Sequence, residues 1–107
     1  MCAESNDRLR RKFQKLYSDL LLLQPTSIIS YLYSKDVISV DDVDKLQKPV
    51  SDVDKWRHLM IHLNNSTNRR PFIELRSAIK RESANGWFID KLDRLGESTY
   101  VHPVVNF

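Results

Sequence analysis

Cysteine, glycine and long apolar runs are all scarce in this chain, and each scarcity excludes something. The single cysteine, Cys2, rules out an internal disulfide and a cysteine-based zinc site, and it favours a reducing compartment, so we expect a cytoplasmic protein. Two glycines in 107 residues argue against a turn-rich β-sandwich. The longest apolar run, residues 20–23, is far shorter than the roughly 20 residues that a membrane span needs, so we expect no membrane partner.

Side chains arranged for catalysis or metal binding are also lacking. His58 and His62 stand at a spacing that can bind zinc on a helix, but no glutamate lies between them and no third ligand is evident. No nucleophile with its base, no carboxylate pair and no phosphate-binding loop can be placed. We therefore expect no enzyme activity, no cofactor and no metal site.

What the sequence does contain is a series of short amphipathic patterns. Apolar residues recur at three- and four-residue steps, which puts them on one side of a helix. Helices this short are not stable singly, so the pattern predicts an all-α fold, a bundle of six helices with one core. The expected starts of these helices are Asp7, Thr26 or Ser27, Ser39, Ser51, Pro71 and Trp87.

Capping serines and apolar stripes add detail to this prediction. Ser39 and Ser51 are each followed by acids, a pattern typical of a helix N-cap. Val53 and Trp56 fall on the apolar stripe of one predicted helix, and Trp87 on that of another. We expect all three to be buried.

Proline and glycine predict where helices stop. Pro25 should end or kink the first helix, because it removes a donor and restricts the residue before it. Gly96 stands where a left-handed C-terminal cap is usual. Residues 97–107 lack a helical period and contain Pro103, so we expect a tail or the start of a linker there.

Charge is divided unevenly along the chain. Residues 1–24 carry five Lys and Arg against three acids, and residues 55–107 carry nine against five. Residues 25–54 reverse the sign, with six Asp against three Lys. A helical domain with one basic and one acidic surface can dock on copies of itself or on a relative.

The order of these segments resembles the caspase-recruitment domain (CARD), a six-helix antiparallel bundle of the death-fold superfamily, over roughly residues 5–96. The segments that carry the resemblance are residues 8–13, 28–39, 56–63, 72–79 and 87–95. The resemblance implies a module that recruits another CARD-containing protein (a caspase, an adaptor or a sensor) or itself. Such modules act in apoptotic or innate-immune signalling, and helical oligomerisation is one form that their association takes.

Carried onto this chain, the resemblance implies two partner-binding patches. The basic patch consists of Arg10, Arg11, Lys15, Lys55 and Arg57. The acidic patch consists of Asp36, Asp41, Asp42 and Asp44. Arginine presents a planar donor fork to carboxylates, and complementary charge fixes the register of an encounter. The competing interpretation is that these charges only solvate helix faces.

Two further functions stay open from the sequence. The first is a small basic helical nucleic-acid-binding domain that uses Arg69, Arg70, Arg76, Lys80 and Arg81. We do not favour it, because no aromatic platform interleaves with these cations and the acidic middle of the chain repels phosphate. The second is a death-fold domain of another subfamily, with a different partner but the same mechanism.

Overall fold

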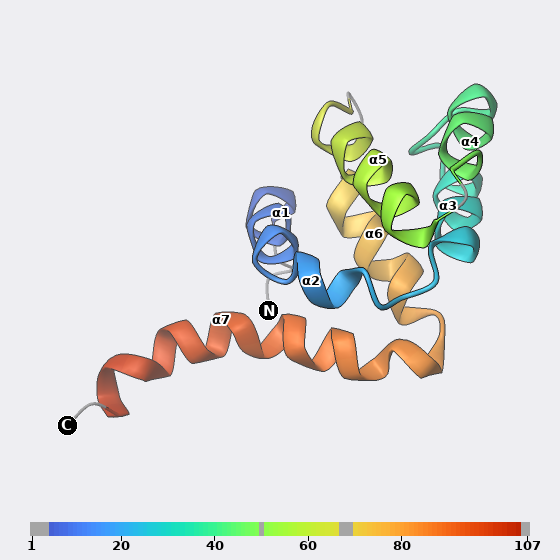
Figure 1. Cartoon of the computed structure of the whole chain (residues 1–107). Helices are drawn as coiled ribbons and strands as arrows, with labels where there is room; N and C mark the ends of the chain where they lie inside the picture. The colour runs from blue at the N-terminus through green and yellow to red at the C-terminus, as the bar shows by residue number, and fades with distance from the viewer. Residues whose placement is uncertain (1–4, 50, 67–69, 106–107) are drawn as a thin grey trace.

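The fold is that of a computed structural model, which describes residues 5–49, 51–66 and 70–105, with side chains described as far as residue 95. These residues form seven α-helices and one 3₁₀-helix, and no strand occurs among them (Figure 1). The elements are α1 (Asn6–Lys15), α2 (Tyr17–Leu20), α3 (Pro25–Ser34), α4 (Val40–Gln47), α5 (Asp52–Asn64), α6 (Pro71–Lys80), η1 (Ser83–Asn85) and α7 (Gly86–Val105). The predicted all-α class is confirmed.

The first predicted helix is divided into α1 and α2 at Leu16. The backbone of Leu16 leaves the helical region, with φ −101° and ψ 21°. The N–H of Leu16 still donates to the carbonyl of Lys12 at 3.0 Å. The apolar stripe predicted for this segment is buried along its whole length, at Leu9, Phe13, Leu16, Leu20 and Leu23.

The predicted start of the second helix is wrong. Pro25 occupies the first position of α3, and Gln24 stands at the N-cap without a side-chain hydrogen bond. Neither Thr26 nor Ser27 caps the helix, because both lie inside it. Proline suits this position, since the N–H that it lacks would have no partner within the helix.

The predicted caps at Ser39 and Ser51 are confirmed. The Ser39 hydroxyl accepts a hydrogen bond from the backbone N–H of Asp42, and the Asp42 carboxylate accepts one from the N–H of Ser39. The Ser51 hydroxyl accepts from the N–H of Asp54 at 3.1 Å. Both helices therefore begin where serine-plus-acid patterns place them.

The predicted end of the last helix is wrong. Helix α7 continues through Gly96 to Val105, and no glycine in the described part of the chain has a positive φ. A glycine inside a helix costs about 1 kcal/mol relative to alanine, so it weakens a helix without having to end it. Residues 97–107 are helical as far as Val105, and their role as a linker stays a prediction.

Aromatic rings from three helices meet in the core. The Phe13 ring of α1 lies 6.0 Å, centroid to centroid, from both Phe72 of α6 and Phe88 of α7. Trp56 is fully buried as predicted, and its indole Nε1 donates to the carbonyl of Leu23 at 2.9 Å. Trp87 is not buried as predicted, because 44% of its surface is exposed. It stacks edge-on against Phe88 from outside the core.

Two groups of helices share this core. Helix α1 packs on α6 and α7, whereas α5 packs on α3 and α4, and α3 also packs on α6. Figure 1 shows α7 crossing below the other helices in that view. The side chain of Asn6, at the start of α1, accepts a hydrogen bond from the N–H of Phe72 in α6 at 2.7 Å. No helix in the described part of the chain is long and apolar enough to cross a membrane.

Candidate functional surface

The predicted acidic patch is built on the turn between α3 and α4 and on the first turns of α4. Asp36 adopts a left-handed backbone conformation with φ 61°, which aspartate tolerates better than most residues. The next two residues, Val37 and Ile38, are buried, and the N–H of Val37 donates to the carbonyl of Leu32 at 3.0 Å. This anchored turn leaves the Asp36 side chain exposed to solvent.

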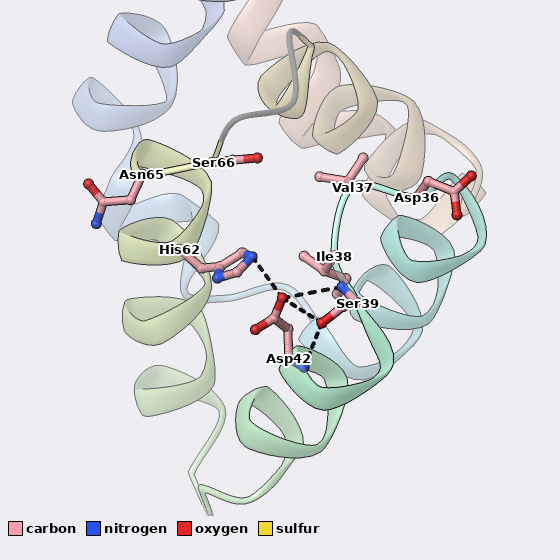
Figure 2. Close-up of a pocket in the computed structure, with 8 residues that line it drawn as sticks. All are labelled: Asp36, Val37, Ile38, Ser39, Asp42, His62, Asn65 and Ser66. Carbon is pink, nitrogen blue, oxygen red and sulfur yellow. Dashed lines mark hydrogen bonds and ion pairs between the residues drawn. The ribbon is translucent and has the colours of Figure 1, made fainter.

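The three acids of α4 divide into two groups. Asp41 and Asp44 lie three residues apart on the helix and are both exposed. Asp42 points the other way, toward α5, where its Oδ2 lies 3.4 Å from Nε2 of His62 (Figure 2). Two of the three acids are therefore free to meet a partner, and the third holds α4 against α5.

Asp42 is fixed by several donors at once. Its Oδ2 accepts from the Ser39 hydroxyl at 2.9 Å and from the Ser39 N–H at 3.2 Å. The hydroxyl bond is the largest cause that lowers the pKa of Asp42 below its ordinary value. Burial opposes this shift, while the backbone hydrogen bond from Ser39 and then the charges of His62 and Lys45 add to it. The carboxylate thus stays charged while it is committed to contacts within the chain.

A cleft of about 450 Å³ lies beside this contact. Figure 2 shows the lining residues, which are Asp36, Val37, Ile38, Ser39, Asp42, His62, Asn65 and Ser66. A serine, an aspartate and a histidine meet here, but the aspartate stands between the other two. A hydrolytic triad needs the histidine next to the serine as its base, so this order cannot activate the Ser39 hydroxyl.

The cleft also offers few metal ligands. Among the residues that the structure describes, no group of three or more His, Cys, Asp or Glu side chains is placed to hold a metal ion. His58, the other half of the spaced histidine pair, is exposed, whereas His62 faces Asp42. Cys2 lies outside the described residues.

The predicted basic patch has one part on α1. Arg11 and Lys15 lie four residues apart on this helix and are both exposed. Arg10 is half-buried, and its guanidinium lies 3.7 Å from the carboxylate of Asp7 one turn earlier. Of the three basic-patch residues on α1, Arg11 and Lys15 are therefore the ones that a partner can approach most easily.

The other part of the basic patch is on α5. Lys55 is half-buried, and the Arg57 side chain is 60% exposed. Arg57 forms an ion pair with Asp54 on its own helix, and this bond is the largest cause that lowers the pKa of Asp54. The structure therefore places the predicted basic residues on two helices with different packing partners, since α1 packs on α6 and α7 and α5 packs on α3 and α4.

Three apolar residues on these charged helices were not assigned to the surface by sequence reasoning. Val40 of α4 and Val53 and Ile61 of α5 are all substantially exposed, so the prediction that Val53 is buried is wrong. A usable signal was present in the sequence. Val53 and Ile61 stand four residues on either side of Arg57, and this spacing puts all three on one side of a helix.

The cations of the nucleic-acid alternative are spread among other contacts. These cations are Arg69, Arg70, Arg76, Lys80 and Arg81. Arg69 lies outside the described residues. Arg76 forms a hydrogen-bonded ion pair with Asp93 of α7 at 3.0 Å, and the guanidinium of Arg81 lies 4.6 Å from the centre of the Tyr31 ring. Arg76 and Arg81 thus already form contacts between helices of the same chain.

No protein-family model, curated protein or solved structure matches this chain.

Proposed function

We propose that this chain is a homotypic interaction domain of the caspase-recruitment type, a death-fold bundle that recruits another such domain or a second copy of itself. The observation that carries this proposal is the exposure of opposite charges on different helices. Asp41 and Asp44 are exposed on α4, and Arg57 is exposed on α5. Carboxylates of one domain can thus face the guanidinium of the next.

Other exposed charges extend the acidic patch and the basic patch. Asp36 adds to the acidic face from the turn before α4, and Arg11 and Lys15 supply cations from α1. Complementary charge speeds encounter and fixes register more than it adds affinity. Because each domain carries both signs, a head-to-tail contact leaves one face free at each end, and association can continue into a helical oligomer.

The resemblance over residues 5–96 also suggests a partner and a cellular process for this domain. The partner is a caspase, an adaptor or a sensor that carries a CARD, and the process is apoptotic or innate-immune signalling in the cytoplasm. No enzyme activity, cofactor or nucleic-acid ligand belongs to the proposal.

Light scattering after size exclusion, at several salt concentrations, tests this function. The mass of the wild-type chain should rise with protein concentration and fall with added salt, because salt screens the attraction. Arg11→Glu and Arg57→Glu should each weaken association by about tenfold or more, since each puts like charges together. Lys80→Glu is the matched control, because Lys80 is exposed on α6 and belongs to neither predicted patch.

Two results would count against this function. If Arg11→Glu and Arg57→Glu associate as well as Lys80→Glu at every salt concentration, charge on these faces does not drive association. If a duplex oligonucleotide binds the chain with an affinity that falls steeply with salt, the nucleic-acid alternative is favoured instead.

A further inference from the structure

Large apolar side chains remain exposed on the same helices that carry the opposite charges. The exposed large apolar residues in the described part of the chain are Leu22, Tyr33, Val40, Val53, Ile61 and Trp87. Three of them lie on α4 and α5, where Val40 is 59% exposed, Ile61 54% and Val53 47%. A single exposed apolar residue needs no explanation. These three, however, stand at four-residue steps from charged residues on the same helices, and this regular spacing calls for one.

On α4, the exposed residues form one row. Val40, Asp44 and Lys48 follow each other at four-residue steps, which places them along one side of the helix. Lys48 is the C-cap residue and keeps helical dihedral angles, φ −64° and ψ −42°, so it continues the row. From the start of α4, the row is apolar, acidic and then basic over a length of roughly 12 Å.

On α5, an equally long row complements the first when it is followed from the end of the helix toward its start. It consists of Ile61, Arg57 and Val53, again at four-residue steps and all exposed. Val53 lies between Asp52 and Asp54 in the first turn. The row is therefore apolar, then basic, then apolar with acids on both sides.

We propose that α4 of one copy of this chain packs antiparallel on α5 of a second copy, with the two rows in register. The pairs are Val40 with Ile61, Asp44 with Arg57, and Lys48 with Val53 and its neighbouring acids. At the third pair, the aliphatic part of the lysine covers the valine while its ammonium group reaches the acids. Each residue of the α4 row thus faces a residue of the α5 row with which it can form an apolar contact or an ion pair.

The opposite orientation is disfavoured by charge. With the two helices parallel, Val40 would meet Val53, and Asp41 would then lie against Asp52 and Asp54. Lys48 would meet Ile61, beside which no acid stands on α5. Like charges that face each other across an interface oppose association, so the antiparallel orientation is selected.

The contact also exchanges one ion pair for two. Within one copy, Arg57 pairs with Asp54 at the surface, and such exposed pairs contribute little to stability. In the proposed contact, Arg57 turns to Asp44 of the second copy, and Lys48 of that copy approaches Asp54. Each of these four charges has a partner in the contact, and the three apolar residues lose their contact with water.

This inference rests on the proposed function and adds to it the partner, a second copy of the same chain, and the register of the contact. The two can fail separately. The proposed function depends on the charges of both patches, including Arg11 of α1, whereas the register depends in addition on the exposed apolar residues Val40 and Ile61.

The first test concerns the apolar pair. Val40→Ser and Ile61→Ser should each weaken self-association of the full chain by about tenfold in sedimentation equilibrium, because central apolar contacts hold an interface together. Leu22→Ser is the matched control, since Leu22 is 72% exposed but lies on neither row. All three positions are exposed, so circular dichroism and the midpoint of thermal unfolding should stay as in the wild type.

The second test concerns the charged pair. Asp44→Arg and Arg57→Asp should each weaken self-association by about tenfold, and the double variant should return to within about threefold of the wild type, because it restores an opposite pair. The control combines Arg57→Asp with Asp90→Arg, which makes the same change in charge at an exposed residue of α7. This control should stay as weak as Arg57→Asp alone.

The outcomes separate the two proposals. If Val40→Ser and Ile61→Ser associate like the wild type while Arg11→Glu and Arg57→Glu do not, the register is wrong and the proposed function stands. If the charge-swapped double variant is no stronger than the Asp90 control, the pairing of Asp44 with Arg57 is wrong. A wild-type chain that stays monomeric at every concentration overturns the second copy as the partner.

Discussion

Nε2 of His62, near the end of α5, lies 3.4 Å from the Asp42 oxygen that closes the capping box of α4. One carboxylate therefore does two things: it begins a helix and it joins that helix to its neighbour. The acidic face of α4 takes its orientation from this junction.

Asp42→Asn should lower the free energy of unfolding by about 1 kcal/mol, because the amide removes the charge that the cap and His62 share. Chemical denaturation followed by circular dichroism measures this change. Asp41→Asn is the matched control, since Asp41 is in the same first turn but is exposed, and it should cost less. Equal losses in the two variants would show that the helix dipole, and not the junction, accounts for the effect.

The contribution of Asp42 should depend on pH in one direction. The pKa of this carboxyl is lowered in the folded chain from an ordinary value of 3.8, chiefly by the Ser39 hydroxyl. The stability that it contributes is therefore fully present above pH 3.8 and is lost as the pH falls through the lower pKa of the folded state. The difference in unfolding free energy between the wild type and Asp42→Asn should be constant near neutral pH and shrink in acid. A difference that grows in acid would contradict this assignment.

Trp56→Phe should cost about 2 to 3 kcal/mol of stability, because it leaves a void in the core and removes the donor to the Leu23 carbonyl. Trp87→Phe should change stability by less than about 0.5 kcal/mol, since Trp87 is largely exposed. Thermal unfolding compares the two variants. Fluorescence provides an independent check, because the emission that remains in Trp87→Phe comes from a buried indole and should be blue-shifted.

Asp36→Gly should be more stable than Asp36→Ala by about 1 kcal/mol, because the residue has a φ of 61° and only glycine adopts this region without a steric cost. Both variants remove the same carboxylate from the acidic face. They should therefore associate equally weakly, which separates the role of the turn from the role of the charge. If alanine is as stable as glycine here, the turn is not strained.

The helical stripes and two of the caps could be predicted because local chemistry decides them. The stripe from Leu9 to Leu23 is buried even though the helix breaks at Leu16, since spacing determines which side faces the core. The Ser39 and Ser51 caps follow from a hydroxyl and an acid within one turn. The helix end predicted at Gly96 was wrong because a glycine permits a helix to end without requiring it to.

The errors in burial have a different cause. Trp87 and Phe88 are neighbours at the start of α7, and adjacent helical residues point in directions about 100° apart, so the burial of one does not bring the other into the core. Phe88 does so, and it stacks on Phe13, which is 75 residues earlier in the chain. Which of two apolar neighbours is buried depends on such distant contacts, which periodicity does not contain.

The sign of the charge on each helix and the ion pairs within one helix could be predicted, but the contacts of charged residues between helices could not. The Arg57 pair with Asp54 follows from a three-residue spacing that is visible in the sequence. The turn of Asp42 toward His62, away from Asp41 and Asp44, depends on how α4 packs against α5. That packing also decides which apolar residues, such as Val40, remain outside.

Helix α6 begins at Pro71 without a side-chain cap from its own N-cap residue, and the side-chain amide oxygen of Asn6 accepts the hydrogen bond from the N–H of Phe72 instead. Because this cap comes from a residue at the start of α1, it is lost as soon as α1 separates from α6. Fraying at α1 therefore withdraws support from the middle of the molecule, and the helices should melt together in one cooperative transition instead of peeling off singly.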